Sequence, residues 1–251
     1  MPANQGLFNE SQIVMTISNK KVRDIPQNLK FMLFKMFGPL DEEEIVHSEQ
    51  LKDWIKPDIF IEYKGIKKYV SIKCGRATEV HAEYIDTFVD FLKDHGLSEE
   101  SCKFIKEYCY GDGTDDGSGT EAMDFLTLKM HFQDRAKKFN EEVMHNPYII
   151  EKAILRCLFE GNRPGMQEAE YIYFGTPQYG ALCSKKQILK HLTRRTWGFM
   201  GNPHIGPLQF RMHIRGQARY EENEYKRHTI DLWWANLQQD IEFISDRYNI
   251  D

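Results

Sequence analysis

The segment "DIFIEYKGIKKYVSIKC", residues 58–74, constrains the fold more than any other part of the chain. Runs rich in β-branched and aromatic residues flank Lys64 and Gly65, which predicts two antiparallel strands joined by a tight turn. With the turn there, Asp58 lies opposite residue 71, within about one residue pair of Ser71 and Lys73. Ser71 and Lys73 are two residues apart, so they share one face of their strand. The sequence therefore predicts a carboxylate, a hydroxyl and an ammonium in one cluster.

Further elements are expected on both sides of this hairpin. "PQNLKFMLFKMFG" predicts a helix that starts at a proline and ends at Gly38, and "DEEEIVHSEQLKDWI" a second helix with an acidic first turn. "QIVMTIS" is consistent with a short strand. "TEVHAEYIDTFVDFLKDHG" predicts a helix with Thr78 as N-cap and Gly96 after its end.

The sequence from residue 98 onward predicts a run of helices followed by strands and one further helix. Residues 98–165 form an expected helical insertion, interrupted by the loop "YGDGTDDGSGT". "AEYIYFG" predicts a strand, "SKKQILKHLTRR" a helix capped by Ser184, and "PLQFRMHIRG" and "RHTIDLWWANL" two strands. This order favours a mixed α/β (α+β) fold, with a central mixed sheet flanked by helices. We expect a single domain over residues 1–251, elaborated by the insertion.

Charge is distributed unevenly along the chain. The net charge of −5 gives no global signature of nucleic-acid binding. However, the segment from Ser184 to Arg227 contains ten Lys and Arg residues and only three Glu. Such a local excess of positive charge is what a phosphate-binding surface requires. The alternative is an exposed sheet face whose cations discourage edge pairing. The candidate nucleic-acid-binding residues are Lys185, Lys186, Lys190, Arg194, Arg195, Arg211 and Arg215.

Several classes of protein are disfavoured. The five cysteines form no CxxC pair and no apolar signal segment opens the chain, which favours free thiols in a reducing cytoplasm. No window approaches 18 apolar residues, so no membrane span is expected. The loop "DGTDDGSGTEAM" resembles a calcium loop, but Met123 occupies the position that needs a bidentate Glu.

The dipeptide Pro57-Asp58 and the tripeptide Ser71-Ile72-Lys73 resemble the PD-(D/E)xK motif of the restriction-endonuclease-like nucleases. The match covers about twenty residues, and its context of helix, hairpin and helix is similar to the core of that superfamily. The resemblance implies a DNA endonuclease of restriction or phage-defence type that depends on Mg²⁺ or Mn²⁺. Asp58 would bind the metal and Lys73 would assist the nucleophile. It also implies that a homodimer would cut both strands.

Ser71 departs from this motif, which has a carboxylate at that position. Some members of the superfamily carry SxK on the strand and place the acid on the following helix, where Glu79 and Glu83 are available. On a helical wheel both acids lie away from the apolar side, and Glu83 is the nearer. We therefore expect Glu83 to be the second metal ligand, while Glu44 and Glu49 remain alternatives.

His81 lies closest to the apolar centre of that expected helix. Its imidazole could orient a phosphate or accept a proton, or it could be a buried histidine bonded to a backbone carbonyl. Two other functions remain open for the whole chain. One is a catalytically inactive protein of the same fold that binds nucleic acid or another protein. The other is a structural α/β protein whose hairpin matches the motif by chance.

Overall fold

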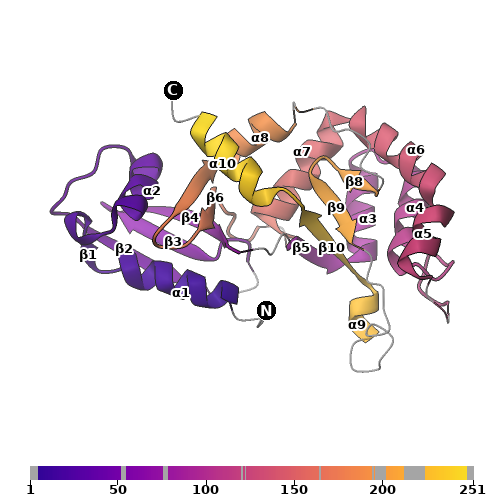
Figure 1. Ribbon diagram of the computed structural model, residues 1–251, viewed down its shortest axis with the longest axis horizontal. Helices are drawn as coiled ribbons and strands as arrows, with labels where there is room; N and C mark the ends of the chain where they lie inside the picture. Colours follow the sequence, from indigo (N-terminus) through magenta and orange to yellow (C-terminus); the bar gives the residue numbers. More distant parts are fainter. Residues whose placement is uncertain are drawn as a thin grey trace. The chain divides into compact units, whose positions relative to one another are not determined.

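The structure, a computed structural model, describes residues 5–51, 55–75, 79–119, 121, 123–163, 165–193, 195, 202–211 and 224–247. Its chain divides into two compact units (Figure 1). The first consists of Met1–Ala77, Leu158–His191 and Asn236–Asp251, and the second of Thr78–Cys157 and Leu192–Ala235. Both combine helices with a sheet, which confirms the predicted mixed α/β class.

The first unit is built on a six-stranded mixed sheet. Its strands are β1 (Lys20–Lys21), β2 (Ile45–Gln50), β3 (Ile59–Tyr63), β4 (Ile66–Lys73), β6 (Tyr171–Gly175) and β7 (Gly180–Ser184). They follow the order β1-β2-β3-β4-β6-β7, and only β4 and β6 run parallel. The predicted turn is confirmed, because Lys64 and Gly65 both have positive φ angles, 50° and 76°. Strand β4, which carries Ser71 and Lys73, lies inside the sheet between β3 and β6.

Helices pack on this sheet and close its core. They are α1 (Gln5–Ile17), the 3₁₀ turn Val22–Asp24, α2 (Gln27–Phe37), α8 (Lys185–Leu192) and α10 (Leu237–Arg247). Helix α1 packs on β2 and β4, while α2 and α10 pack on β7. The segment "QIVMTIS" is thus helical rather than a strand. Ile13 and Ile17, one helical turn apart, are fully buried against Ile59 and Val70 in the same core cluster.

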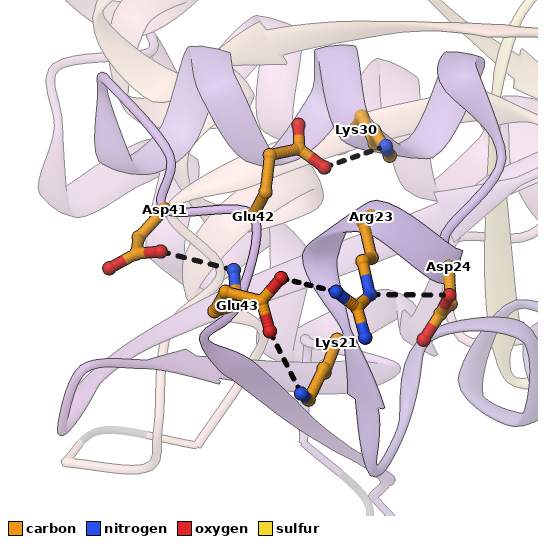
Figure 2. A network of polar contacts seen from close by, with 7 residues as sticks. All are labelled: Lys21, Arg23, Asp24, Lys30, Asp41, Glu42 and Glu43. Carbon is orange, nitrogen blue, oxygen red and sulfur yellow. Dashed lines mark hydrogen bonds and ion pairs between the residues drawn. The ribbon is translucent and has the colours of Figure 1, made fainter.

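The acidic segment before β2 is a loop, not the first turn of the predicted helix. Its carboxylates pair with cations from elsewhere in the first unit, as Figure 2 shows. The network contains Lys21, Arg23, Asp24, Lys30, Asp41, Glu42 and Glu43. These carboxylates are exposed, so the individual pairs contribute little to stability. The following residues alternate in burial and form the strand β2.

The second unit carries the helices α3 (Ile85–Asp94), α4 (Glu99–Tyr110), α5 (Phe125–His131), α6 (Gln133–Met144), α7 (Pro147–Leu155) and α9 (Glu224–Arg227). Its antiparallel sheet has the order β5-β10-β9-β8. The strands are β5 (Glu79–Tyr84), β8 (His204–Ile205), β9 (Leu208–Arg211) and β10 (Thr229–Trp234). The described part of residues 98–165, the predicted helical insertion, contains helices and no strand. Most of these residues belong to a compact unit that begins before residue 98 and also includes this sheet. The expected N-cap Thr78 lies outside the described residues.

The π-helical segment Arg156–Glu160 follows α7. Within the described part of the chain, no helix is long and apolar enough to cross a membrane. The five cysteines, all of which the structure describes, form no disulfide.

Candidate active site

The hairpin of β3 and β4 holds Asp58 in place through its backbone and its side chain. The backbone N–H of Asp58 donates to the carbonyl of Val70 at 3.0 Å, which continues the ladder one residue beyond β3. Its Oδ2 atom accepts hydrogen bonds from the hydroxyl of Ser71 at 3.0 Å and from the backbone N–H of Ile72 at 2.5 Å. The predicted proximity of Asp58 to residue 71 is therefore confirmed.

Lys73 completes the cluster at the end of β4. Its Nζ atom lies 3.7 Å from Asp58 Oδ2, and the two side chains are 24% and 23% exposed. Ser71 is buried, at 1% exposure. The ammonium and carboxylate thus remain accessible to a ligand from solvent, whereas the serine supports the carboxylate from inside.

A second carboxylate, Glu10 of α1, lies in the neighbourhood of this pair, since it binds Gln50 of β2, whose partner Ile59 follows Asp58 in the chain. It is 9% exposed, and its Oε2 accepts a hydrogen bond from Gln50 Nε2 at 2.8 Å. Burial raises the pKa of Glu10, and the negative charge of Asp58 raises it further. The Gln50 hydrogen bond and the positive charge of Lys73 act in the opposite direction. The two acids therefore repel one another at a place where Lys73 only partly compensates their charge.

Sequence reasoning missed Glu10 because the only element expected in this part of the chain was the short strand at residues 12–18, which does not include it. In a helix Glu10, Ile13 and Ile17 recur at the spacing of one buried face. An ionisable residue at the end of an otherwise apolar stripe was the signal that could have identified it. The neighbouring Asn9 donates its Nδ2 to the carbonyl of Gly175 at 2.8 Å, which ties α1 to the end of β6.

Glu83, the expected second metal ligand, lies in β5 of the second unit and not in a helix. Its Oε1 and Oε2 atoms accept hydrogen bonds from Arg156 at 2.8 and 2.6 Å, and His81 Nε2 lies 2.9 Å from Oε1. Burial acts to raise the pKa of Glu83, but the hydrogen bonds from His81 and Arg156 outweigh it and lower that pKa. The carboxylate is thus engaged by a guanidinium that also stacks on Phe91, with 4.4 Å to the ring centroid.

The remaining candidate acids and His81 occupy other positions. His81 is buried in β5 beside Glu83. Glu79 begins the same strand and is exposed. Glu49 is exposed in β2 opposite Phe60. Glu44 precedes β2, where its backbone carbonyl accepts from Val22 N–H at 3.0 Å. In the part of the chain that the structure describes, none of these residues joins two others in a cluster able to hold a metal.

The basic candidates have different surroundings. Lys185 pairs with Glu168 at 2.7 Å and lies 3.9 Å from Glu160. Lys186 and Lys190 are exposed on α8, one turn apart, and Arg195 is also exposed. Arg211 ends β9, whereas Arg194 and Arg215 lie outside the described residues. A continuous phosphate-binding surface therefore remains a prediction.

Glu10 and Asp58 offer carboxylate oxygens, the type of ligand that a small divalent cation prefers. Mg²⁺ binds hard oxygen ligands and often uses one or two protein carboxylates together with water and substrate phosphates. Burial is the main cause of the raised pKa of Glu10 and the negative charge of Asp58 the second, and a bound cation would oppose the second cause. Lys73 provides a charge for a phosphate beside it.

Comparisons with protein-family models, with curated proteins and with solved structures found no match to this chain.

Proposed function

We propose that this protein is a metal-dependent nuclease that hydrolyses phosphodiester bonds, with DNA as its substrate and restriction or phage defence as its role. The observation that carries the proposal is the ion pair of Asp58 with Lys73 at the end of β4, with the buried acid Glu10 near enough for both of their charges to act on it. A buried carboxylate, a partly exposed carboxylate and a partly exposed ammonium are the groups that this chemistry requires.

Each protein group has a distinct task. Glu10 and Asp58 hold Mg²⁺ or Mn²⁺ through their carboxylate oxygens. The hydroxyl of Ser71 and the backbone N–H of Ile72 fix the orientation of Asp58. When bound, the cation polarises the phosphate and lowers the pKa of a water molecule.

Lys73 stabilises the negative charge that grows on the phosphate during attack. Its ammonium is anchored beside Asp58 and is only partly exposed, so it is less strongly screened than a surface lysine. Lys73 therefore contributes most when the phosphate is most negative, which is the condition for lowering the barrier.

Ser71 stands where the motif has a carboxylate, and Glu83 was the residue expected to replace that acid. Glu10 from α1 supplies the missing acid, and Ser71 supports Asp58 in place of a strand carboxylate. Glu83 would have to release Arg156 before it could bind a metal, and leaving that buried guanidinium unpaired is costly.

Incubation of supercoiled and linear DNA with Mg²⁺ or Mn²⁺ tests this function. The Lys73→Ala variant should lose about 100-fold or more in rate, and EDTA should abolish cleavage. Lys67→Ala is the matched control, because Lys67 lies on the same strand and pairs with Glu62 at 3.5 Å. Equal rates in Lys73→Ala and the wild-type protein would refute the proposal.

A non-catalytic nucleic-acid- or protein-binding role is the second candidate. It is favoured by the three donors that already surround Asp58 Oδ2 and by the serine at the position of the motif carboxylate. DNA binding that weakens with salt but is never followed by cleavage would select it.

A further inference from the structure

The β6–β7 hairpin ends in a tight tip at residues 176–179, between paired Gly175 and Gly180. Thr176 N–H donates to the carbonyl of Tyr179 at 2.8 Å. The hydroxyl of Tyr173 donates to the carbonyl of Thr176 at 2.6 Å from inside the sheet. The tip is therefore closed by hydrogen bonds across its own backbone.

Close packing leaves this tip little freedom. A Cβ atom on Gly175, whose φ is +151°, would lie 2.2 Å from the carbonyl oxygen of Tyr179. A Cβ atom on Gly180 would lie 2.3 Å from the hydroxyl oxygen of Tyr173. Both distances are too short for a Cβ atom, so the close packing at the base of the tip requires glycine at positions 175 and 180.

The tip borders the candidate active site. Strands β4 and β6 run parallel, with Lys73 beside Phe174, so the tip begins two residues after the partner of Lys73. On the other side, Asn9 donates to the carbonyl of Gly175, and Asn9 is the chain neighbour of Glu10. Lys73 is thus connected to the base of this hairpin by strand pairing, and Glu10 is connected to it through the hydrogen bond of its neighbour Asn9.

Tyr179 is 63% exposed, and Leu7, one helical turn before Glu10, is 57% exposed. A tyrosine on a rigid backbone offers a large apolar face and loses little conformational entropy when a ligand covers it. Next to a site that handles phosphodiesters, the ligand whose faces match this ring is a nucleobase.

We infer that Tyr179 stacks on an unpaired base beside the scissile phosphate, so that the preferred substrate is single-stranded or carries unpaired bases. This inference rests on the proposed nuclease function, because it takes the phosphate at Lys73 as its reference point. In a continuous duplex both faces of a base are covered by its neighbours, and an exposed ring could reach them only after the base leaves the stack.

Fluorescence anisotropy in EDTA tests the inference without requiring cleavage. A labelled single-stranded oligonucleotide and its duplex would be titrated with the wild-type protein and with Tyr179→Ala and Tyr179→Phe variants. Phe34→Ala is the matched control, since Phe34 is a 51% exposed aromatic residue on α2. Thermal unfolding of each variant verifies that the protein remains folded.

Loss of one stacked base should weaken single-strand binding by about tenfold in Tyr179→Ala. Tyr179→Phe and Phe34→Ala should stay within about twofold of wild type, and duplex binding should be equal in all variants. The inference is overturned if the wild-type protein does not bind the single strand. It is also overturned if Tyr179→Ala binds it as wild type does, or loses equal affinity for both ligands. A Tyr179→Phe variant as weak as Tyr179→Ala would assign the effect to the hydroxyl and overturn stacking.

The same oligonucleotides with Mg²⁺ separate this inference from the proposed function. Tyr179-dependent binding without cleavage would support stacking and refute the nuclease. Cleavage by the wild-type protein with no effect of Tyr179→Ala on binding would support the nuclease and refute stacking.

Discussion

The Nζ atom of Lys73 lies 3.7 Å from the Oδ2 atom of Asp58. The same oxygen accepts hydrogen bonds from the Ser71 hydroxyl and the Ile72 backbone N–H, so its position is set by the hairpin itself. Together with the buried acid Glu10, this pair makes up the site that we propose to bind a cation and a phosphate.

Glu10→Gln should stabilise the metal-free protein at neutral pH. Burial raises the pKa of Glu10, so its contribution favours folding below the ordinary Glu pKa of 4.5 and is lost as the pH rises through the raised value. At neutral pH the charged Glu10 therefore lowers the free energy of unfolding. Its replacement should raise that free energy by about 1 kcal/mol, measured by urea denaturation in EDTA.

The gain from Glu10→Gln should disappear when the pH falls below 4.5, because Glu10 is then protonated in both states. Gln50→Ala would serve as a comparison, since it removes the hydrogen bond to Glu10 but retains the charge. A Glu10→Gln variant that is less stable than wild type at neutral pH would show that the carboxylate is already well compensated.

Ser71→Ala should reduce cleavage by about tenfold, because Asp58 loses one of the donors that orient it. Its cost to the free energy of unfolding should be about 1 kcal/mol. Ser48→Ala is the matched control. Ser48 is also buried, and its hydroxyl donates to the carbonyl of Phe60 at 2.8 Å. Ser48→Ala should cost similar stability without changing the rate, and equal losses of rate in the two variants would contradict the role of Ser71.

Arg156→Met should destabilise the second unit by about 3–5 kcal/mol, since it leaves the buried carboxylate of Glu83 without its guanidinium partner. Lys93→Met, which breaks an exposed pair with Glu99, should cost much less stability. Thermal unfolding of both variants provides the comparison.

The Glu83 pair should also have a characteristic pH dependence. The pKa of Glu83 is lowered in the folded protein, so its stabilisation is present above 4.5 and is lost as the pH falls through the lowered value. The difference in stability between wild type and Arg156→Met should therefore narrow in acid. A difference that stays constant over this range would indicate that packing on Phe91, rather than charge, is lost.

Gly175→Ala should cost about 1–3 kcal/mol, because the new Cβ would collide with the carbonyl of Tyr179 and the residue has a positive φ. The exposed Gly65→Ala substitution is a control with a positive φ but without a nearby atom. Urea denaturation should show a larger loss for Gly175→Ala than for Gly65→Ala. Equal losses of stability would mean that the positive φ alone, and not the collision of the new Cβ with the Tyr179 carbonyl, accounts for the cost of Gly175→Ala.

Local patterns predicted the elements whose signals lie within a few residues. The Lys64-Gly65 turn, the end of α2 at Gly38 and the strand β6 all follow from turn residues and alternation. The same reasoning placed Asp58 beside Ser71, because a hairpin's register follows from its turn.

The errors occurred where contacts distant in sequence decide the structure. The β-branched residues of α1 favour a strand locally, but burial of Ile13 and Ile17 on the sheet makes the segment helical. Conversely, "EVHAEY" is a strand because it pairs with β10, a partner from near the end of the chain. The local pattern marks Glu10 as a buried acid, but only tertiary packing brings it near Asp58, so its neighbours could not be read from the sequence.

Calorimetric titration with Mn²⁺ tests most directly whether Glu10 and Asp58 form a metal site. We predict one binding site in the wild-type protein, weakened at least about tenfold in both Glu10→Gln and Asp58→Asn. The control Glu62→Gln, an acid on β3 that pairs with Lys67, should bind as wild type does. Absence of binding to the wild-type protein would contradict the proposed metal centre, and so would a Glu10→Gln or Asp58→Asn variant that binds Mn²⁺ as tightly as wild type does.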